Sequence, residues 1–208
     1  MRPGPVRRRL GASVSPVAVG IEVVPVGRDG TAALGPLFAS ARTTRHCWCT
    51  AFCSTGRQLA GGWFGGGNRR RLEALAGGEH PVGVLAMLDG DPVGWGACGP
   101  RFRYLIGDPS RHPLLGGRPR AEDETVWLLP CLVVHAEHRG RGVSHAVLDG
   151  VVGLAHQQGA AAVEAWPSSA PGEGFVGREG LFVERGFRCV DRPVPGRAVL
   201  RLELGGPA

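Results

Sequence analysis

The residues VWLLPCLVV at positions 126–134 are followed by HAEHRGRGVSHAVLDGVVGLAHQQG at positions 135–159, and these two stretches decide the fold. The first is almost wholly apolar, which predicts a central strand buried on both faces. The second contains a predicted helix over 142–158 that ends at Gly159. Apolar residues recur along one side of this helix at helical spacing, namely Val143, Val147, Val151 and Leu154. A buried strand followed by an amphipathic helix indicates an α/β protein.

The loop between this strand and this helix has the chemistry of an anion site. The first backbone N–H groups of a helix have no intrahelical partner, and the helix dipole adds positive potential there. A phosphate or pyrophosphate therefore fits at such an end. Gly140 and Gly142 would let the backbone approach a ligand closely, and Arg139 and Arg141 could neutralise phosphate charge. The alternative is a plain turn that carries two solvated arginines.

The rest of the chain predicts further alternating elements. Strands are expected over 21–26, 82–88, 92–98, 160–166, 187–191 and 198–204, and helices over 31–45, 69–76 and 175–185. Asn68 is the expected cap of the second of these helices, and GGWFGGG at 61–67 is a loop with an exposed aromatic pair. We expect a basic tail over 1–18 and a single domain over 19–208.

The 208-residue chain is basic, but its charge is uneven. It carries 24 arginines and no lysine against 18 acidic residues, a net charge of +6, and a single asparagine. Because lysine and asparagine codons are AT-rich, this composition indicates a GC-rich bacterial genome. Four arginines lie within the first nine residues, which leaves only 20 against 18 acids in the remainder. The distribution therefore argues against a nucleic-acid partner.

The N-terminal Arg7-Arg8-Arg9 run could open an export signal, but the sequence after it does not continue as one. The following stretch is short, contains Pro16, and precedes no Ala-x-Ala cleavage site. No apolar run approaches the roughly 18 residues of a membrane-spanning helix. We therefore expect a cytoplasmic protein without a membrane partner.

Six cysteines raise the question of a metal or disulfide framework. Cys47, Cys49 and Cys53 are clustered after His46, but no second Cys/His pair completes a zinc site. The chain is too long to depend on disulfides for its stability. We expect no metal and a reduced thiol cluster that lines a pocket.

The segment Arg139-x-x-Gly142-x-Ser144, between a buried strand and an amphipathic helix, resembles the acyl-CoA pyrophosphate loop of the GNAT acetyltransferase superfamily. The family pattern is Gln/Arg-x-x-Gly-x-Gly/Ala, so Ser144 departs from it by one small residue. The resemblance runs from about Val82 to Leu204 and includes LFVERGF at 181–187. It implies a GNAT fold with a central mixed sheet of six to seven strands, splayed middle strands and flanking helices.

The resemblance also implies acetyl-CoA as co-substrate and assigns roles along the strand and the loop. The pantetheine arm would pair with the exposed backbone of the strand, and the N–H groups near Leu132 would hold the tetrahedral oxyanion. Pro130 supports a break there, because proline cannot donate to a sheet ladder. The expected cofactor contacts are Leu132, Val133, Val134, Arg139, Gly140, Arg141, Gly142, Val143 and Ser144.

The amine must attack in its neutral form, so a group has to accept its proton. Glu164 is the leading candidate, because a carboxylate among the apolar residues of a central strand is costly unless it is used or paired. The alternative is a structural ion pair with an arginine. Glu124 and His135 are the other candidates. The tyrosine that protonates the departing thiolate in many GNAT enzymes is replaced here by Phe182, which leaves the general acid unassigned.

Acceptor recognition is expected from segments outside the CoA loop. The candidate residues are Cys47, Cys49, Trp95 and Trp166. The Cys-Trp-Cys and VEAWP stretches are similar to a poorly characterised actinobacterial-type GNAT subgroup. We expect an N-acetyltransferase acting on a primary amine of a small molecule, a metabolite or antibiotic. A catalytically silent CoA-binding module, acetylation of a protein or peptide amine, and a homodimer are left open.

Overall fold

The computed structural model describes residues 20–104, 114, 117–168 and 176–205. The expected basic tail over 1–18 lies outside the described residues. The strands are β1 (Ile21–Val26), β2 (Gly83–Leu88), β3 (Asp91–Pro100), β4 (Val126–Val134), β5 (Ala162–Ala165), β6 (Arg188–Val194) and β7 (Arg197–Glu203). The α-helices are α1 (Leu34–Ala39), α2 (Arg42–Cys47), α3 (Gly56–Gly61), α4 (Gly67–Ala76), α5 (Val143–Gln157) and α6 (Glu179–Val183). Short 3-10 helices are η1 (Arg28–Ala33), η2 (Ala51–Cys53), η3 (Arg101–Tyr104), η5 (Arg120–Glu122) and η6 (Ala136–His138).

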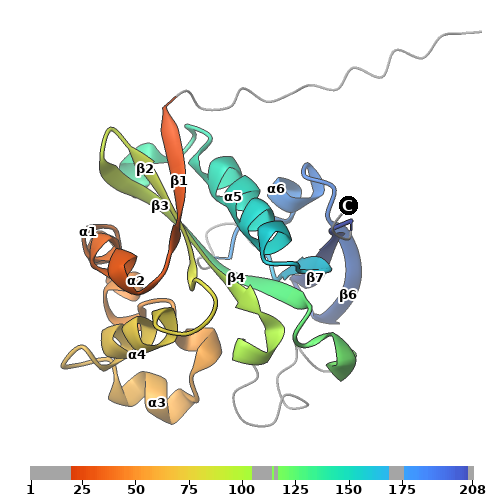
Figure 1. The fold of residues 1–208 in the computed structure, drawn as a ribbon, viewed down its shortest axis with the longest axis horizontal. Coiled ribbons are helices and arrows are strands. Elements are labelled where there is room, and N and C mark those ends of the chain that lie inside the picture. Colours follow the sequence, from red (N-terminus) through yellow and green to blue (C-terminus); the bar gives the residue numbers. More distant parts are fainter. Residues whose placement is uncertain (1–19, 105–113, 115–116, 169–175, 206–208) are drawn as a thin grey trace, which may run out of the picture.

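The strands form one seven-stranded mixed sheet in the order β1-β2-β3-β4-β5-β7-β6 (Figure 1). All neighbouring pairs are antiparallel except β4 and β5, which run parallel. Helix α5 provides the crossover between these two parallel strands. The predicted α/β class, the number of strands and the GNAT arrangement are confirmed.

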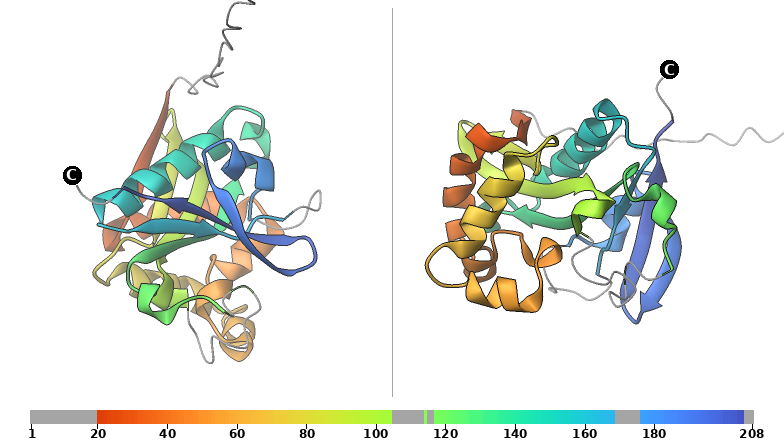
Figure 2. Two further views of the ribbon diagram at one scale, coloured as in Figure 1. Left: turned by 90° about the vertical axis from the view of Figure 1, so that its right-hand side faces the viewer. Right: turned by 60° about the horizontal axis from the view of Figure 1, so that its bottom comes forward.

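Helices cover the two faces of the sheet separately (Figure 2). On one face α5 packs against β1 to β5 and contacts α6, and the core there is built around Val147, Val151 and Phe182. On the other face α1, α2 and α4 cover the half of the sheet near β1, around Phe38 and Trp95. The sheet is therefore the middle layer, and β4 is buried on both sides, as its apolar sequence predicts.

Two glycines of β3 bring α5 close to the sheet. A Cβ added at Gly94 would lie 2.5 Å from Val143 Cγ1, and one at Gly96 would lie 2.7 Å from Val147 Cγ1. Both distances are shorter than real carbon contacts, so any larger residue would push the helix away. This close packing fixes the N-terminus of α5 against the middle of the sheet.

The helix predicted over 31–45 is wrong as one continuous element. The structure divides it into η1, α1 and α2, with a break before Arg42. Ala41 has extended backbone angles (φ −130°, ψ 140°), and the Ser40 hydroxyl donates to the Leu37 carbonyl oxygen at 2.6 Å. The periodicity of apolar residues continued through the break, so it did not reveal the change of direction.

Two smaller predictions also need correction. Asn68 does not cap α4: the capping position is Gly66, and the buried Asn68 amide donates to the carbonyl oxygens of His46 and Leu59 at 2.8 and 3.1 Å. The helix predicted over 175–185 is much shorter, with α6 spanning only Glu179–Val183. The short helix α3 was not predicted; its N-terminus is a capping box between Thr55 and Gln58.

None of the helices in the described part of the chain is long and apolar enough to cross a membrane.

Candidate active site

The two parallel strands at the centre of the sheet separate along their length. Pairing of β4 with β5 runs only from Val126 with Ala162 to Leu129 with Ala165. Strand β4 continues to Val134, whereas β5 ends at Ala165. Pro130 stands at the first position after the pairing ends, where a missing N–H costs no ladder hydrogen bond on the β5 side. The splay that the resemblance implies, and that Pro130 supports, is present.

The unpaired part of β4 turns backbone groups toward the gap. On its other side β4 pairs with β3, and the His135 N–H donates to the Val93 carbonyl oxygen at 2.9 Å. In an antiparallel ladder, alternate residues direct their N–H and C=O groups to opposite sides. Leu132 and Val134 therefore direct theirs away from β3, into the splay. An extended amide-containing ligand can pair with these groups as an added strand does.

The loop after β4 ends at the N-terminus of α5 in the left-handed backbone conformation. Gly140 and Gly142 have φ of +73° and +80°, and Gly142 is the residue that caps the helix. An L-residue with a side chain is strained at such angles, so both positions favour glycine. In the first turn of α5, the earliest backbone N–H with an acceptor among the described residues belongs to His145, and it donates to the Gly142 carbonyl oxygen at 3.0 Å. The amides of Val143 and Ser144 precede it and face outward at the positive end of a 15-residue helix.

Arginine side chains flank these amides. Arg139 and Arg141 are exposed, and neither guanidinium group forms a hydrogen bond or ion pair with any residue that the structure describes. His135 and His138 stand at the start of the loop with their rings 5.5 Å apart. The loop thus combines outward amides, a helix N-terminus and two uncommitted guanidinium groups, which together suit a pyrophosphate.

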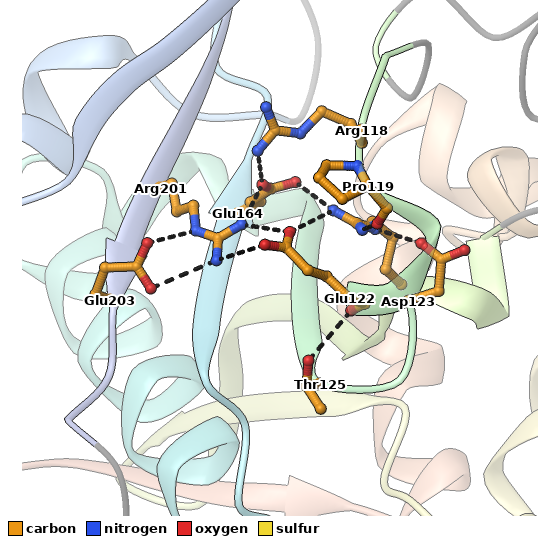
Figure 3. A network of polar contacts seen from close by, with 9 residues as sticks. Arg118, Pro119, Glu122, Asp123, Thr125, Glu164, Arg201 and Glu203 are labelled. Carbon is orange, nitrogen blue, oxygen red and sulfur yellow. Dashed lines mark hydrogen bonds and ion pairs between the residues drawn. The ribbon is translucent and has the colours of Figure 1, made fainter.

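Glu164, the predicted proton acceptor, lies on β5 opposite Leu128 of β4, one register position before the two strands separate (Figure 3). Its carboxylate is completely buried and contacts three arginines. Arg118 donates to it closely, Arg201 Nη1 lies 3.3 Å from Oε1, and Arg101 Nη1 lies 3.5 Å from Oε2. These contacts correspond to the structural ion-pair alternative. The role of Glu164 as a base stays a prediction.

The same arginines connect Glu164 to a wider network (Figure 3). Arg101 is fully buried and also reaches Asp123 at 2.7 Å, while Arg201 reaches Glu122 at 2.8 Å and Glu203 at 2.7 Å. The hydrogen bond from Arg201 lowers the pKa of Glu122, against a smaller opposing effect of burial, and the charges of the neighbouring arginines lower it further. Each buried charge in this network is compensated, which is the condition for burying charge at all.

The candidate base Glu124 and two aromatic residues that bear on the unassigned general acid, Phe182 and the chain's single tyrosine, lie in different settings. Glu124 is exposed in the turn before β4, at the end of the strand away from the splay. Phe182 is fully buried and packs on Phe187 with ring centroids 5.4 Å apart. Tyr104 is buried in another cluster, and burial raises its pKa well above the ordinary value.

The predicted acceptor residues are mostly inside the protein. Trp95 and Trp166 are buried in the core, and Trp166 packs edge-on against Phe52 at 5.5 Å. Cys47 is half-buried and Cys49 is buried against β4. Contact between these residues and an acceptor stays a prediction.

A cavity of about 390 Å³ lies beside α2 and is lined by Arg42, Thr43, His46 and Trp63. The His46 and Trp63 rings are stacked, with centroids 5.2 Å apart, and His46 Nδ1 lies 3.1 Å from the Trp63 carbonyl oxygen. Phe64, 79% exposed, stands next to them. Trp63 and Phe64 were singled out from the sequence. The stacking of His46, which lies 17 residues earlier, on the Trp63 ring was not predicted.

Among the described residues, no group of three or more His, Cys, Asp or Glu side chains is arranged to hold a metal ion. The structure adds Arg101, Arg118 and Arg201 to the residues singled out from the sequence. The only sequence signal for them was the buried acidic residue Glu164, which requires positive partners without specifying which.

The fold and the site together define an α/β protein with a splayed parallel strand pair and, between β4 and α5, a loop whose chemistry suits an anion. The model of the acetyltransferase (GNAT) family matches residues 52–175, more than half of the chain. The protein therefore belongs to the GNAT acetyltransferase family, a family of transferases. No curated protein matches the sequence.

Solved structures with the same fold have low sequence identity to this chain. An acetyltransferase from Thermus thermophilus is 18% identical with a TM-score of 0.54, covering 90% of this chain and 99% of its own. The PaiA N-acetyltransferase from Thermoplasma acidophilum, solved in complex with coenzyme A, is 10% identical with a TM-score of 0.55, covering 89% and 100%. The ribosomal-protein-S18-alanine N-acetyltransferase from Escherichia coli is 11% identical with a TM-score of 0.52, covering 90% and 96%.

Proposed function

We propose that this protein is an N-acetyltransferase that moves an acetyl group from acetyl-CoA to a primary amine of a small molecule. The observation that carries the proposal is the continuity of two features: the outward amides at the N-terminus of α5 lie one short loop away from the unpaired stretch of β4. The first suits a pyrophosphate, and the second suits the amide-containing arm attached to it. The neighbour solved with coenzyme A has the same fold, which agrees with this assignment.

In this proposal each part of the site has a separate task. The amides of Val143 and Ser144, with Arg139 and Arg141, bind the pyrophosphate, and the left-handed glycines allow the close approach. Backbone groups of Leu132 and Val134 hold the pantetheine arm. The Leu132 N–H then donates to the thioester oxygen, which becomes an oxyanion when the neutral amine attacks the carbonyl carbon. The nitrogen of this intermediate loses one proton, for which Glu164 is the proposed acceptor. Collapse of the intermediate then expels the CoA thiolate and leaves the amide.

Two observations support a small acceptor. The cavity beside α2 falls within the size range of small-molecule sites. Three residues after His46, which lines this cavity, Cys49 touches Cys131, the neighbour of Leu132. The chain thus runs from the cavity wall to β4 within three residues. We also propose that the protein is bacterial and cytoplasmic and that it belongs to the actinobacterial-type GNAT subgroup.

The E. coli neighbour is named for acetylating a protein alanine, so a peptide amine is the competing acceptor. The test is a panel of primary amines that includes small molecules and short peptides with free N-termini. Acetylated product and free CoA are measured by mass spectrometry over a range of pH. Product with small amines supports the proposal, and product with peptides alone overturns its acceptor. Binding of acetyl-CoA without turnover of any amine at any pH would indicate the silent CoA-binding module.

A further inference from the structure

Two cysteines from distant parts of the chain meet on the face of the sheet opposite α5. Cys49 follows α2 and Cys131 lies on β4, 82 residues later, and their sulfur atoms are 2.8 Å apart. In a disulfide the sulfur atoms are about 2.05 Å apart. A shift of less than 1 Å would therefore bring the two sulfurs to bonding distance.

The backbone holds Cys49 in this position against its own preference. Trp48 and Cys49 are consecutive residues with positive φ, +49° and +46°, although neither is glycine. Residues of this kind persist only when their surroundings impose the conformation. Here Trp48 packs edge-on against Phe38 at 5.2 Å, and its indole N–H donates to the Arg45 carbonyl oxygen at 3.1 Å. The packing of Trp48 thus aims the Cys49 side chain at β4.

The pair lies next to the proposed thioester position. Cys131 stands between Pro130, where β4 leaves β5, and Leu132, whose N–H faces the splay. Both thiols are buried, with 4% and 7% of their residue surfaces exposed. Burial raises the pKa of the Cys49 thiol well above its ordinary value, and the neighbouring Cys131 raises it further. Only a small oxidant can reach such a pair, and the low thiolate fraction makes the reaction slow at neutral pH.

We propose that Cys49 and Cys131 are a disulfide-forming pair that hydrogen peroxide oxidises, and that the bond attaches the segment after α2 to β4 beside the thioester position. One thiolate attacks the peroxide, and with one proton it gives a sulfenic acid and water. The second thiol then displaces water from the sulfenic sulfur and forms the S–S bond. Two thiols and one peroxide give one disulfide and two waters, and two electrons pass from sulfur to the peroxide.

Peptide mapping tests the bond directly. Because the chain contains no lysine, trypsin cleaves it only after arginine and releases residues 46–57 and 121–139 as separate peptides. The reduced full-length protein is treated with hydrogen peroxide, its remaining thiols are alkylated, and the digest is analysed by mass spectrometry without reduction. We expect one cross-linked species that joins these two peptides and lacks two hydrogen atoms. Its rate of formation should increase with pH.

Three variants assign the bond, because the first peptide also contains Cys47 and Cys53. Cys49→Ser should abolish the cross-link, whereas Cys47→Ser and Cys53→Ser should retain it. The oxidised wild-type protein should melt about 5–10 °C above the reduced protein, since the bond closes a long loop of the unfolded chain. A cross-link through Cys47 or Cys53, or oxidation of the exposed Cys189 alone, would overturn the proposal.

The effect on activity rests on the proposed function. Drawing Cys131 toward Cys49 would displace the Leu132 amide, and small misplacements in an active site are costly. We expect turnover to fall at least tenfold on oxidation and to recover with dithiothreitol. Whatever turnover Cys49→Ser has before treatment should not change when peroxide is added. If the reduced protein has no activity with any amine, the proposed function fails, while the peptide map still decides whether the disulfide forms.

Discussion

Two polar regions beside the β4–β5 pair differ in what their charged and polar groups do. We call the loop between β4 and α5 the open end. We call the charge network around Glu164, which extends to Glu122 and Asp123 before the start of β4, the closed end. At the end where the strands separate, the helix amides and the Arg139 and Arg141 side chains have no partner among the described residues. In the closed end, Arg101, Arg118 and Arg201 surround the buried Glu164 carboxylate. The first end has unsatisfied groups that a ligand can use, and the second has charges that satisfy one another. This difference agrees with our proposal that the open end binds acetyl-CoA, and it favours a contribution of the closed end to stability.

The largest expected effect is at the open end. Gly142→Asp places a carboxylate where the pyrophosphate is proposed to bind, so acetyl-CoA affinity should fall about 1,000-fold, or about 4 kcal/mol. Isothermal titration calorimetry measures this loss. Gly159→Asp is the matched control, because Gly159 has a similar φ of +76° at the far end of α5. Equal affinities of Gly142→Asp and the wild type would contradict the site.

The closed end should respond in stability. Glu164→Gln leaves three arginines without their central carboxylate, and we expect a loss of about 3 kcal/mol and a melting temperature about 6–12 °C lower. Glu203→Gln is the control, because Glu203 pairs with the same Arg201 but is largely exposed; its effect should be small.

The same Glu164→Gln variant separates the two roles of this residue. If Glu164 forms a structural ion pair, the folded variant keeps its turnover number. If Glu164 accepts the proton of the amine, turnover falls about 100-fold or more and the acid limb of the pH–rate profile disappears. Measuring kcat at a temperature where the variant is folded distinguishes these results.

Smaller effects are expected for the two loop arginines. Arg139→Ala and Arg141→Ala should each weaken acetyl-CoA binding about fivefold, since exposed charges contribute about 1 kcal/mol to phosphate contacts. The loss should shrink as salt increases. Arg57→Ala, on α3, is the control. A loss that does not change with salt would argue against a phosphate contact.

The smallest expected effect is a pH dependence of the melting temperature, which comes from Glu122 in the closed end. Because the folded protein lowers the pKa of Glu122 below its ordinary 4.5, its ionised form adds stability above that pH. The contribution is lost as pH falls through the lowered pKa. Wild type and Glu122→Gln should therefore differ in melting temperature at pH 7 by about 1–3 °C and converge as the pH falls below the lowered pKa of Glu122. A difference that persists at low pH would show that the effect does not come from ionisation.

Much of the fold and of the open end could be predicted from the sequence. The apolar run over 126–134, Pro130 and the glycines of the loop each carry a local signal, because strand burial, a missing N–H and positive φ are properties of single residues and short stretches. The closed end could not be predicted beyond Glu164. Its arginines come from three distant segments, and only the folded chain brings them together. The break at Ala41 and the meeting of Cys49 with Cys131 are likewise products of tertiary packing.

The most direct test of the central claim is a crystal structure of the protein with bound CoA. We predict that the pyrophosphate lies on the amides of Val143 and Ser144, and that the pantetheine arm pairs with the backbone of Leu132 and Val134 in the gap between β4 and β5. A CoA molecule bound elsewhere on the protein, with this loop and gap empty, would contradict the account.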